Sequence, residues 1–519
     1  ESNSNFDNKV AYQKVAFLYG LDLYNEGNYP EAAAAFKKSL KEPRDPLYVT
    51  RATYWKAESD YVANDFKEAI IGYKQFLNNS NAASTPEYKD INYNLAYAYF
   101  SDKQYEQAAS FFELYTASNV QDETKLNDAY LRLGDSRFIS SKYWPALEAY
   151  NKSIALNKTD QDYATFQKSM SYGFIKKDED KINGLQTFST KFPNSTYRDD
   201  ALYELGNIYV SQNKNDQAIT AYDKLVRDLP GSSHVSKAML KKALILDNKN
   251  KSDEALALLR KVAGDYPGTP EALQAVTTAK LIYIDLGRVD EYGEWVSTLE
   301  FIDVADAELD DAAYASAEKQ YVENNVGQAE RLFESYLSDY PNGQHALHAH
   351  FYLGQLAFAK AEYNKTIPHY QYVIAKERSE FTEQALARLG QVYLTDKNYS
   401  AAIPVLKRLE TEADFPQNIV FAQSNLMKSF YESEDLTKAV SYAEKVLGNA
   451  KIDNAVKSDA QIIIARSSIK TGDNARAKTA YAEVQKIATG ALAAEALYYD
   501  AYFTNEAQNF EASNVAVQK

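Results

Sequence analysis

Residues 202–230 read LYELGNIYVSQNKNDQAITAYDKLVRDLP, and this stretch decides the fold. Its apolar and small residues recur three and four positions apart and so line one face of a first helix: Leu202, Leu205, Gly206 and Tyr209. After a polar break, Ala218 and Tyr222 mark a second helix at a spacing of four. Pro230 and the glycine after it end that helix, because neither residue continues a helix well. The stretch therefore predicts two antiparallel helices joined by a short turn.

The same pattern recurs along the chain. With the alanine of the second helix as a phase marker, neighbouring repeats lie 36 to 39 residues apart, at Ala32, Ala69, Ala108, Ala146, Ala218, Ala255, Ala329, Ala402, Ala439 and Ala477. Four further positions of the series fall near Gly184, Tyr292, Thr366 and Ser513. The spacing predicts an all-α solenoid of about fourteen helix-turn-helix repeats, the last of them short.

Small residues on the first helix explain how the two helices of each pair would pack closely. They let two helix backbones approach, and aromatic residues fill the space beside them. The positions are Gly20, Ala57, Ala96, Gly134, Gly206, Ala243, Ala317, Gly354, Gly390 and Ala465. A lone helix pair cannot bury enough apolar surface to fold, so stacking on neighbouring pairs is obligatory. We expect an elongated superhelix.

Two lapses in the pattern divide the repeats into blocks. The period is weak over 165–190 and again over 275–311, which suggests the blocks 1–165, 166–310 and 311–519. The lapses are either hinges and changes of superhelical pitch or merely divergent repeats. Pro368 and Pro404 fall deep in second helices, where we expect a bent or delayed helix start.

The composition excludes several classes of partner and site. The formal net charge of -15 would repel a phosphate backbone, so we expect no nucleic acid partner. The absence of cysteine excludes disulfides, thiolate nucleophiles and cysteine zinc sites. No apolar run approaches the roughly 18 to 20 residues that a membrane crossing needs, although peripheral membrane association stays open. The sequence begins at Glu1, and we expect it to be a mature or trimmed chain.

The sequence carries no motif of a catalytic or cofactor site. It lacks a phosphate-binding Gly-Lys-Ser loop, a zinc-protease His-Glu pair and a glycine-flanked nucleophilic serine. Four histidines, His345, His348, His350 and His369, lie close in sequence, but no second cluster completes a metal shell. The acidic runs 178–180 and 303–311 lack the ligand spacing of a calcium loop, and solvated turns explain them better. We therefore expect no enzyme activity, no cofactor and no metal.

Through these repeats the whole chain resembles the tetratricopeptide repeat superfamily, which implies a right-handed superhelix. The blocks FPNSTYRDDALYELGNIY (192–209) and YPGTPEALQAV (266–276) are similar to repeats of bacterial envelope proteins, including the Tol-Pal coordinator and the barrel-assembly lipoprotein. The tyrosine and asparagine usage resembles long repeat proteins of Bacteroidota. The resemblance implies a binding function without chemistry and a periplasmic or outer-membrane-associated location, with the cytoplasm as the alternative.

One familiar binding mode of that superfamily is not supported here. Cytosolic chaperone adaptors use Lys and Asn on first helices to clamp a C-terminal carboxylate. The corresponding places in this sequence hold Phe17 and Leu21, Tyr54 and Glu58, Tyr93 and Tyr97, or Tyr314 and Glu318. A carboxylate clamp is therefore not expected.

Several first helices instead carry two aromatic residues seven positions apart, which return to the same face after two turns. These seven-spaced pairs are Phe17 and Tyr24, Tyr54 and Tyr61, Tyr93 and Phe100, Tyr314 and Tyr321, and Phe351 and Phe358. Tyrosine offers apolar area with a polar tip, which suits a bound peptide or partner helix. The alternative interpretation is packing between adjacent first helices.

The sequence thus predicts a non-catalytic protein-interaction scaffold of a bacterial cell envelope. Its partner, a protein or peptide of unknown identity, would lie in an aromatic-lined concave groove. The alternative is a glycan- or nutrient-capturing envelope protein, which the presence of only 3 Trp disfavours because sugar platforms favour that residue. A self-assembling structural element is a third interpretation.

Overall fold

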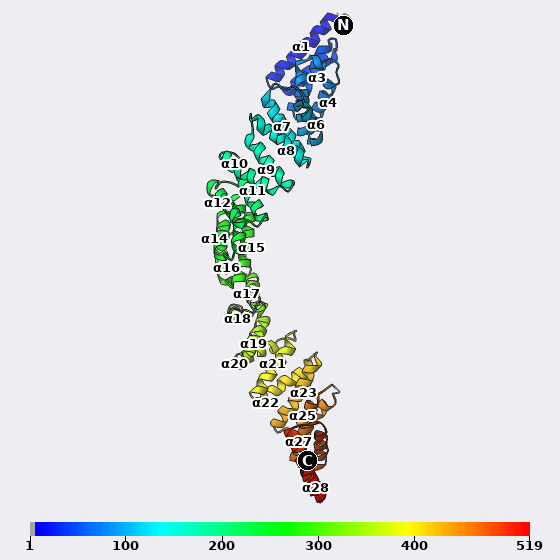
Figure 1. The fold of residues 1–519 in the computed structure, drawn as a ribbon, viewed down its shortest axis with the longest axis vertical. Coiled ribbons are helices and arrows are strands. Elements are labelled where there is room, and N and C mark those ends of the chain that lie inside the picture. Colours follow the sequence, from blue (N-terminus) through cyan, green and yellow to red (C-terminus); the bar gives the residue numbers. More distant parts are fainter. Residues whose placement is uncertain (1–5, 450, 519) are drawn as a thin grey trace. The chain divides into compact units, whose positions relative to one another are not determined.

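A computed structural model describes residues 6–449 and 451–518, which form fourteen helix pairs in chain order (Figure 1). The chain divides into two compact units, Glu1–Ala272 and Leu273–Lys519. The boundary lies inside α15 (Pro270–Leu286), within the block 166–310 that the sequence groups together. The grouping of repeats into three blocks stays a prediction.

The N-terminal unit contains seven complete pairs. They are α1 (Phe6–Asn25) and α2 (Tyr29–Lys41), α3 (Pro46–Val62) and α4 (Phe66–Leu77), α5 (Ile91–Ser101) and α6 (Tyr105–Thr116), α7 (Glu123–Ile139) and α8 (Tyr143–Leu156), α9 (Gln161–Phe174) and α10 (Asp178–Lys191), α11 (Arg198–Ser211) and α12 (Asn215–Asp228), and α13 (Val235–Asn248) and α14 (Ser252–Asp265). Two short 3-10 turns, Ala82–Ser84 and Pro86–Lys89, precede α5. Each second helix up to α12 packs on the first helix of the next pair, which makes this unit a solenoid.

The C-terminal unit continues in the same way. Its helices after α15 are α16 (Val289–Val296), α17 (Asp306–Val322) and α18 (Val326–Asp339), α19 (Ala346–Ala359) and α20 (Tyr363–Ala375), α21 (Thr382–Thr395) and α22 (Tyr399–Glu412), α23 (Pro416–Glu432) and α24 (Leu436–Leu447), α25 (Asn454–Thr471) and α26 (Asn474–Ile487), and α27 (Ala491–Glu506) and α28 (Phe510–Val517). The structure confirms an all-α solenoid of helix pairs.

Close packing inside each pair confirms the role of the small residues. A Cβ atom added to Gly206 of α11 would lie 2.2 Å from the ring of Tyr222 in α12, closer than real contacts allow. The same substitution at Gly134 would meet Tyr150 at 2.5 Å. Both tyrosines are fully buried. The aromatic ring therefore occupies the space that the missing side chain leaves.

The two sequence lapses have different outcomes. The pair α9 and α10 forms two regular helices, so the weak period over 165–190 does not shorten the repeat. In the second lapse, α16 is a short helix that ends at Val296, and α17 begins only at Asp306. For Pro368 and Pro404 the sequence predicts a bent or a delayed helix start. The delayed start is wrong, because α20 and α22 begin in phase at Tyr363 and Tyr399, and the bend stays a prediction.

The turn inside every pair has one backbone conformation. The residue two positions before each second helix has a positive φ: Gly27, Asn64, Lys103, Ser141, Lys176, Asn213, Asn250, Gly287, Asn324, Ala361, Lys397, Glu434, Gly472 and Gln508. The amide of the next residue then donates to a carbonyl five positions back, as Asp435 does to Phe430 at 2.9 Å. This left-handed cap satisfies the last carbonyls of the first helix.

Glu434 occupies that left-handed position with φ 61°, and its side chain is exposed. We expect Glu434→Gly to raise the free energy of unfolding locally by about 0.5 to 1 kcal/mol, because glycine avoids the clash of Cβ with the backbone. Urea unfolding and hydrogen exchange in α23 and α24 measure the change. Asn213→Gly is the matched control and should change little, since asparagine tolerates this conformation. Equal gains at both positions would contradict the explanation.

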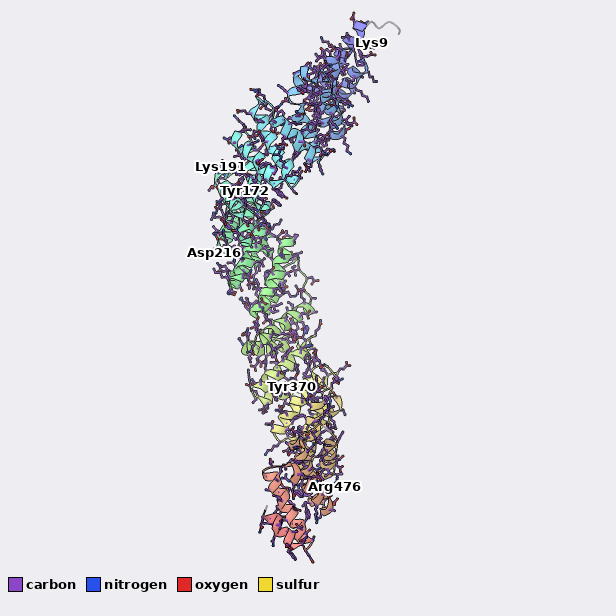
Figure 2. The ribbon with its side chains drawn as sticks, turned by 45° about the vertical axis from the view of Figure 1, so that its right-hand side comes forward. Lys9, Tyr172, Lys191, Asp216, Tyr370 and Arg476 are labelled. Atoms are coloured by element: carbon purple, nitrogen blue, oxygen red, sulfur yellow. The ribbon has the colours of Figure 1, made fainter. Side chains whose placement is uncertain are left out.

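Exposed ion pairs link successive repeats. Lys249 pairs with Asp216 at 2.5 Å and Lys214 with Glu179 at 2.9 Å, and Arg476 pairs with Glu444; Figure 2 labels Asp216 and Arg476 among the side chains. Such surface pairs contribute at most about 1 kcal/mol each. Packing of the buried rings and alanines therefore determines the stability of the stack.

Candidate partner-binding surface

The first members of four seven-spaced pairs lie in the core. Phe17, Tyr54, Tyr314 and Phe351 are between 0% and 6% exposed. Phe17 contacts Phe36 and Tyr48, and Phe351 stacks on Phe381 with 4.3 Å between ring centroids. A partner would therefore reach only the second member of each of these pairs.

The other six aromatic residues are half-buried: Tyr24, Tyr61, Tyr93, Phe100, Tyr321 and Phe358. Their rings also contact neighbouring helices, as Tyr24 does with Trp55 at 5.1 Å and Tyr321 with Tyr352 at 4.5 Å. Packing between neighbouring helices thus explains why each of these rings is partly buried. Their role in binding stays a prediction.

Two of the predicted residues from different pairs meet in a hollow of about 220 Å³. Tyr61 comes from α3 and Tyr93 from α5, the next first helix. The hollow, here called the tyrosine hollow, is lined by Glu58, Tyr61, Tyr73, Tyr93, Asn94 and Tyr97. Sequence spacing placed Tyr61 and Tyr93 on first helices, but it did not bring them to one cavity or identify the other four residues.

Hydrogen bonds to one carboxylate fix the floor of the tyrosine hollow. The Tyr73 hydroxyl donates to Glu58 Oε2 at 2.6 Å, and Asn94 Nδ2 donates to the same oxygen at 2.7 Å. Asn94 Nδ2 also lies 2.6 Å from the Tyr54 hydroxyl, which accepts its other hydrogen. These bonds tie α3, α4 and α5 together, so the hollow is formed before any ligand arrives.

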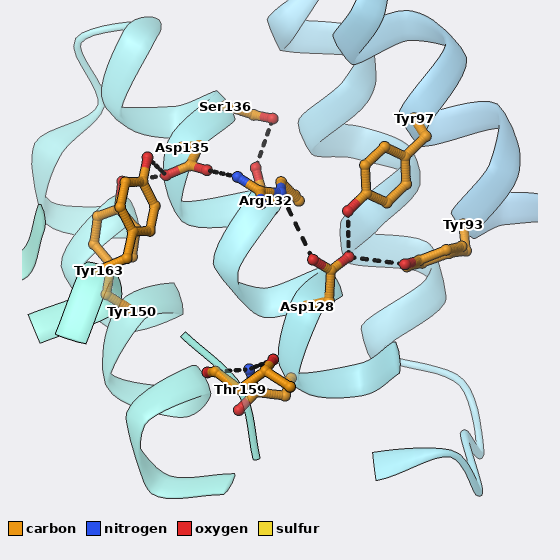
Figure 3. Close-up of polar contacts among 10 residues, drawn as sticks. Tyr93, Tyr97, Asp128, Arg132, Asp135, Ser136, Tyr150, Thr159 and Tyr163 are labelled. Carbon is orange, nitrogen blue, oxygen red and sulfur yellow. Dashed lines mark hydrogen bonds and ion pairs between the residues drawn. The ribbon is translucent and has the colours of Figure 1, made fainter. Parts of the chain in front are cut away.

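Two more carboxylates extend this network along α7, as Figure 3 shows. Asp128 Oδ2 accepts from the Tyr93 hydroxyl at 2.8 Å and from the Tyr97 hydroxyl. Arg132 lies between the two carboxylates, 3.6 Å from Asp128 and 2.7 Å from Asp135. Asp135 in turn accepts from two further tyrosines, Tyr150 at 3.0 Å and Tyr163 at 3.1 Å. The guanidinium of Arg132 thus forms ion pairs with two carboxylates.

In three repeats the network follows a spacing that sequence comparison between repeats could have revealed. The repeat of Tyr481 departs from it, because the corresponding residue there is Arg466 and the Tyr481 hydroxyl donates to Glu495. In the three repeats, the residue after the small first-helix position accepts a hydrogen bond from the second-helix tyrosine 15 positions later. The pairs are Glu58 with Tyr73, Asp135 with Tyr150, and Asn207 with Tyr222. Where phenylalanine replaces the tyrosine, as at Phe36, the corresponding residue Leu21 accepts nothing from it.

Burial and the nearby carboxylates keep these phenols protonated. Burial raises the pKa of Tyr54 and Tyr73 well above the usual value, and the negative charge of Glu58 adds to the effect. The same two causes raise the pKa of Tyr24 to about 12. Burial also raises the pKa of Asp135, against the opposing influence of Arg132. The tyrosines therefore act as hydrogen-bond donors at neutral pH.

A second, larger hollow of about 620 Å³ lies on first helices of the C-terminal unit, between α21 and α23. Its wall includes Glu383, which accepts from the backbone amide of Phe415 at 3.2 Å and from Asn418 Nδ2 at 2.6 Å. Arg388 also lines it and lies 4.6 Å over the ring of Phe358. The seven-spaced pairs led only to Phe358, at its edge.

The histidine cluster divides among separate contacts. His345 lies 2.8 Å from Asp311 and stacks on Tyr314, and His348 contacts Phe381 edge-on. His350 and His369 face each other with 2.9 Å between their Nδ1 atoms. Burial lowers the pKa of His350 to about 4, and His369 adds to the shift. In the described ranges, no group of three or more His, Asp or Glu residues is placed to hold a metal ion.

Comparison with known families agrees with this repeat geometry. The family profile described as tetratricopeptide repeat matches residues 18–84 and 203–270, and a second profile of the same description matches residues 90–119. Tetratricopeptide repeats are thus recognised in residues 18–84, 90–119 and 203–270. No curated protein matches the sequence.

Several solved structures resemble parts of the chain. The C-terminal part of a tetratricopeptide repeat protein from Cytophaga hutchinsonii is 15% identical with a TM-score of 0.41, over 50% of this chain and 98% of that one. YrrB, described as having an unusual peptide-binding site, is 20% identical with a TM-score of 0.32, over 42% and 99%. The type IV pilus biogenesis factor PilW is 15% identical with a TM-score of 0.32, over 44% and 98%.

Tetratricopeptide repeats are protein-interaction scaffolds, and this fold is generally non-catalytic. A protein or peptide is therefore the class of partner that the repeats indicate. None of the helices in residues 6–449 and 451–518 has the length and apolar character needed to cross a membrane.

Proposed function

We propose that this chain is a non-catalytic docking scaffold of the bacterial cell envelope that binds an extended peptide segment of a partner protein. The binding site is the tyrosine hollow and the first helices around it. The observation that carries the proposal is the meeting of Tyr61 and Tyr93, from neighbouring repeats, in one preformed cavity. Tyrosine suits such a site because it presents apolar area and a polar tip with little loss of side-chain entropy.

The surrounding network supports binding more than chemistry. Glu58, Asp128 and Asp135 each accept hydrogen bonds from two donors or more, so their oxygens serve to hold tyrosine rings in place. A preformed site avoids the entropy cost of ordering its side chains when the partner arrives. These carboxylates hold structure and offer no nucleophile or paired acid and base.

The site predicts a selective loss of binding for Tyr61→Ala. This ring is half-buried at the edge of the core, 5.7 Å from the ring of Phe66, and its hydroxyl makes one long contact, 3.5 Å to Ser101. We therefore expect its removal to reduce helix content little. Peptides selected on the whole chain from a phage-displayed random library should bind this variant about tenfold more weakly, as expected for an aromatic residue at the centre of a site. Isothermal calorimetry measures the loss, and circular dichroism checks the helix content.

Trp144→Ala in α8 is the matched control, because that indole is 55% exposed and lies outside the hollow. The peptides selected on the native chain should bind this control variant with unchanged affinity. Tyr54 is unsuited to this test since it lies in the core. If no peptide is enriched, or if Tyr61→Ala binds all of them as the native chain does, the proposal fails.

The envelope location rests on the resemblance of residues 192–209 and 266–276 to repeats of periplasmic and outer-membrane-associated proteins. Fractionation of the bacterium that makes the protein, followed by detection with a specific antibody, tests this part separately. Recovery in the periplasmic or outer-membrane fraction is expected. Recovery in the cytoplasm alone would refute the location and leave the binding site unaffected.

A further inference from the structure

The charge of the tyrosine hollow identifies the chemistry of its occupant. Glu58 accepts hydrogen bonds only from neutral donors, the Tyr73 hydroxyl and the Asn94 amide. Among residues 6–449 and 451–518, it forms no ion pair. Two lysines of α3 and α7 pair with other carboxylates, Lys56 with Asp60 and Lys125 with Asp90, both at 2.7 Å. Lys125 Nζ also lies 5.8 Å over the ring of Tyr93, so this ring already accepts one cation on a face. The carboxylate at the floor of the hollow therefore has no cation to balance it.

The walls add to this negative potential. Four tyrosine rings line the hollow, and the face of each ring is electron-rich. Beyond them, Asp128 and Asp135 share the single guanidinium of Arg132. Of the three carboxylates that hold the tyrosines, Asp128 and Asp135 thus share one guanidinium, and Glu58 has no cationic partner within residues 6–449 and 451–518.

Having proposed above that a peptide binds here, we infer further that the tyrosine hollow receives a basic side chain, lysine or arginine, from that peptide. Its cationic head would lie against the rings of Tyr61, Tyr93 and Tyr97 and close to Glu58. The volume of about 220 Å³ equals roughly seven waters of about 30 Å³ each, enough for one long side chain.

Other occupants fit less well. An acidic side chain would meet Glu58 as a like charge, which costs binding energy. An apolar side chain would remove water from Glu58 without supplying a countercharge. The chain itself uses the proposed contact elsewhere, with Lys376 Nζ 4.7 Å over Tyr372 and Lys470 Nζ 4.9 Å over Tyr431. The overall net charge of -15 also favours the approach of a basic partner.

Fluorescence anisotropy with three labelled peptides tests the inference on the whole chain at low ionic strength. In each peptide serine alternates with one other residue: lysine, glutamate or leucine. The lysine peptide should bind, and Glu58→Gln should weaken it by about fivefold or more, because glutamine keeps the hydrogen-bond acceptor and removes the charge. Glu254→Gln in α14 makes the same change in net charge at an exposed surface ion pair, and it should alter binding by less than about twofold.

The outcomes of this experiment distinguish a failure of this inference from a failure of the proposed function on which it rests. Equal weakening by Glu58→Gln and Glu254→Gln, or no binding of the lysine peptide, overturns the basic-residue inference. The basic-residue inference would also be overturned if the leucine or glutamate peptide bound the native chain and Tyr61→Ala abolished that binding. The tyrosine hollow would then still be the binding site. Hydrogen exchange on the native chain gives a readout independent of variants: the lysine peptide should protect α3 and α5, and protection confined to other helices refutes the proposal.

Discussion

Gly206→Ala should destabilise the repeat formed by α11 and α12 by about 1 to 3 kcal/mol, although alanine favours helices more than glycine does. The new methyl group would lie 2.2 Å from Tyr222 Cε1 and 2.6 Å from its Cζ. The tyrosine cannot yield easily, because its ring is fully buried and its hydroxyl donates to Asn207 Oδ1 at 2.9 Å. Either the ring leaves its position or the two helices separate.

Gly264→Ala in α14 is the matched control. A Cβ atom at Gly264 would meet nothing within 4 Å, and the residue lies exposed in the last turn of the helix. The same chemical change should therefore stabilise the chain there by about 0.5 to 1 kcal/mol.

Hydrogen exchange resolved by repeat distinguishes the two outcomes. Because each repeat contacts mainly its neighbours, Gly206→Ala should accelerate exchange first in α9 to α14. A gain in stability at Gly206, or uniform loosening over the described chain, would contradict the packing explanation.

Alkaline pH should unfold the chain cooperatively at about one to two units above the ordinary tyrosine pKa of about 10. Among the residues that the structure describes, nine tyrosines are fully buried: Tyr73, Tyr115, Tyr150, Tyr222, Tyr283, Tyr292, Tyr336, Tyr370 and Tyr481. Burial raises the pKa of Tyr292 to about 12, and it raises the pKa of Tyr150 further, where the Asp135 carboxylate adds to the effect. Ionisation of Tyr150 in the folded chain would place a second anion beside the buried Asp135 carboxylate.

The sign of the pH dependence follows from these shifts. The folded chain holds the phenol proton more tightly than the unfolded chain does, so this stability is fully present below about pH 10 and is lost as pH rises above it. Each fully buried tyrosine contributes up to about 1.4 kcal/mol per pH unit in that range. A few tyrosines therefore suffice to offset a domain stability of about 5 to 15 kcal/mol.

Circular dichroism and tyrosinate absorbance, followed together during an alkaline titration, measure this transition. Absorbance from exposed tyrosines should rise first, and the remaining increase should coincide with the loss of helix. Tyr222→Phe keeps the ring and removes an ionisable group, so it should shift the transition upward in pH. This variant also separates tyrosine ionisation from the loss of lysine charge. Complete ionisation with the helices intact would contradict the prediction.

The period of the fold was accessible from sequence because it depends on local properties. Alanine every 36 to 39 residues, with an aromatic residue four positions later, marks a helix that must pack on its neighbours. Local properties were also a poor guide at Pro368 and Pro404, which suggested a bent or delayed helix start. The delay does not occur, because tertiary packing keeps α20 and α22 in phase. Local propensity is weaker than the packing of buried rings.

The candidate site was predictable only in part. Heptad spacing placed aromatic residues on first helices, yet it could not distinguish Tyr54, at 6% exposed, from the half-buried Tyr61 one heptad later. Nor did the spacing indicate that acidic residues would accept hydrogen bonds inside the core. Asp310, assigned from sequence to a solvated turn, is buried in α17 and accepts from the Tyr336 hydroxyl at 2.5 Å.

The sequence by itself determined that this chain forms helix pairs, the period at which they recur, and which glycines and alanines lie at their crossings. These features depend on residues close together in the chain. Only the tertiary structure decided which rings remain accessible, how Glu58, Asp128 and Asp135 are partnered, and where a hollow opens between α3 and α5. Those properties depend on contacts between residues of different repeats, because burial and charge compensation are set by neighbours in space.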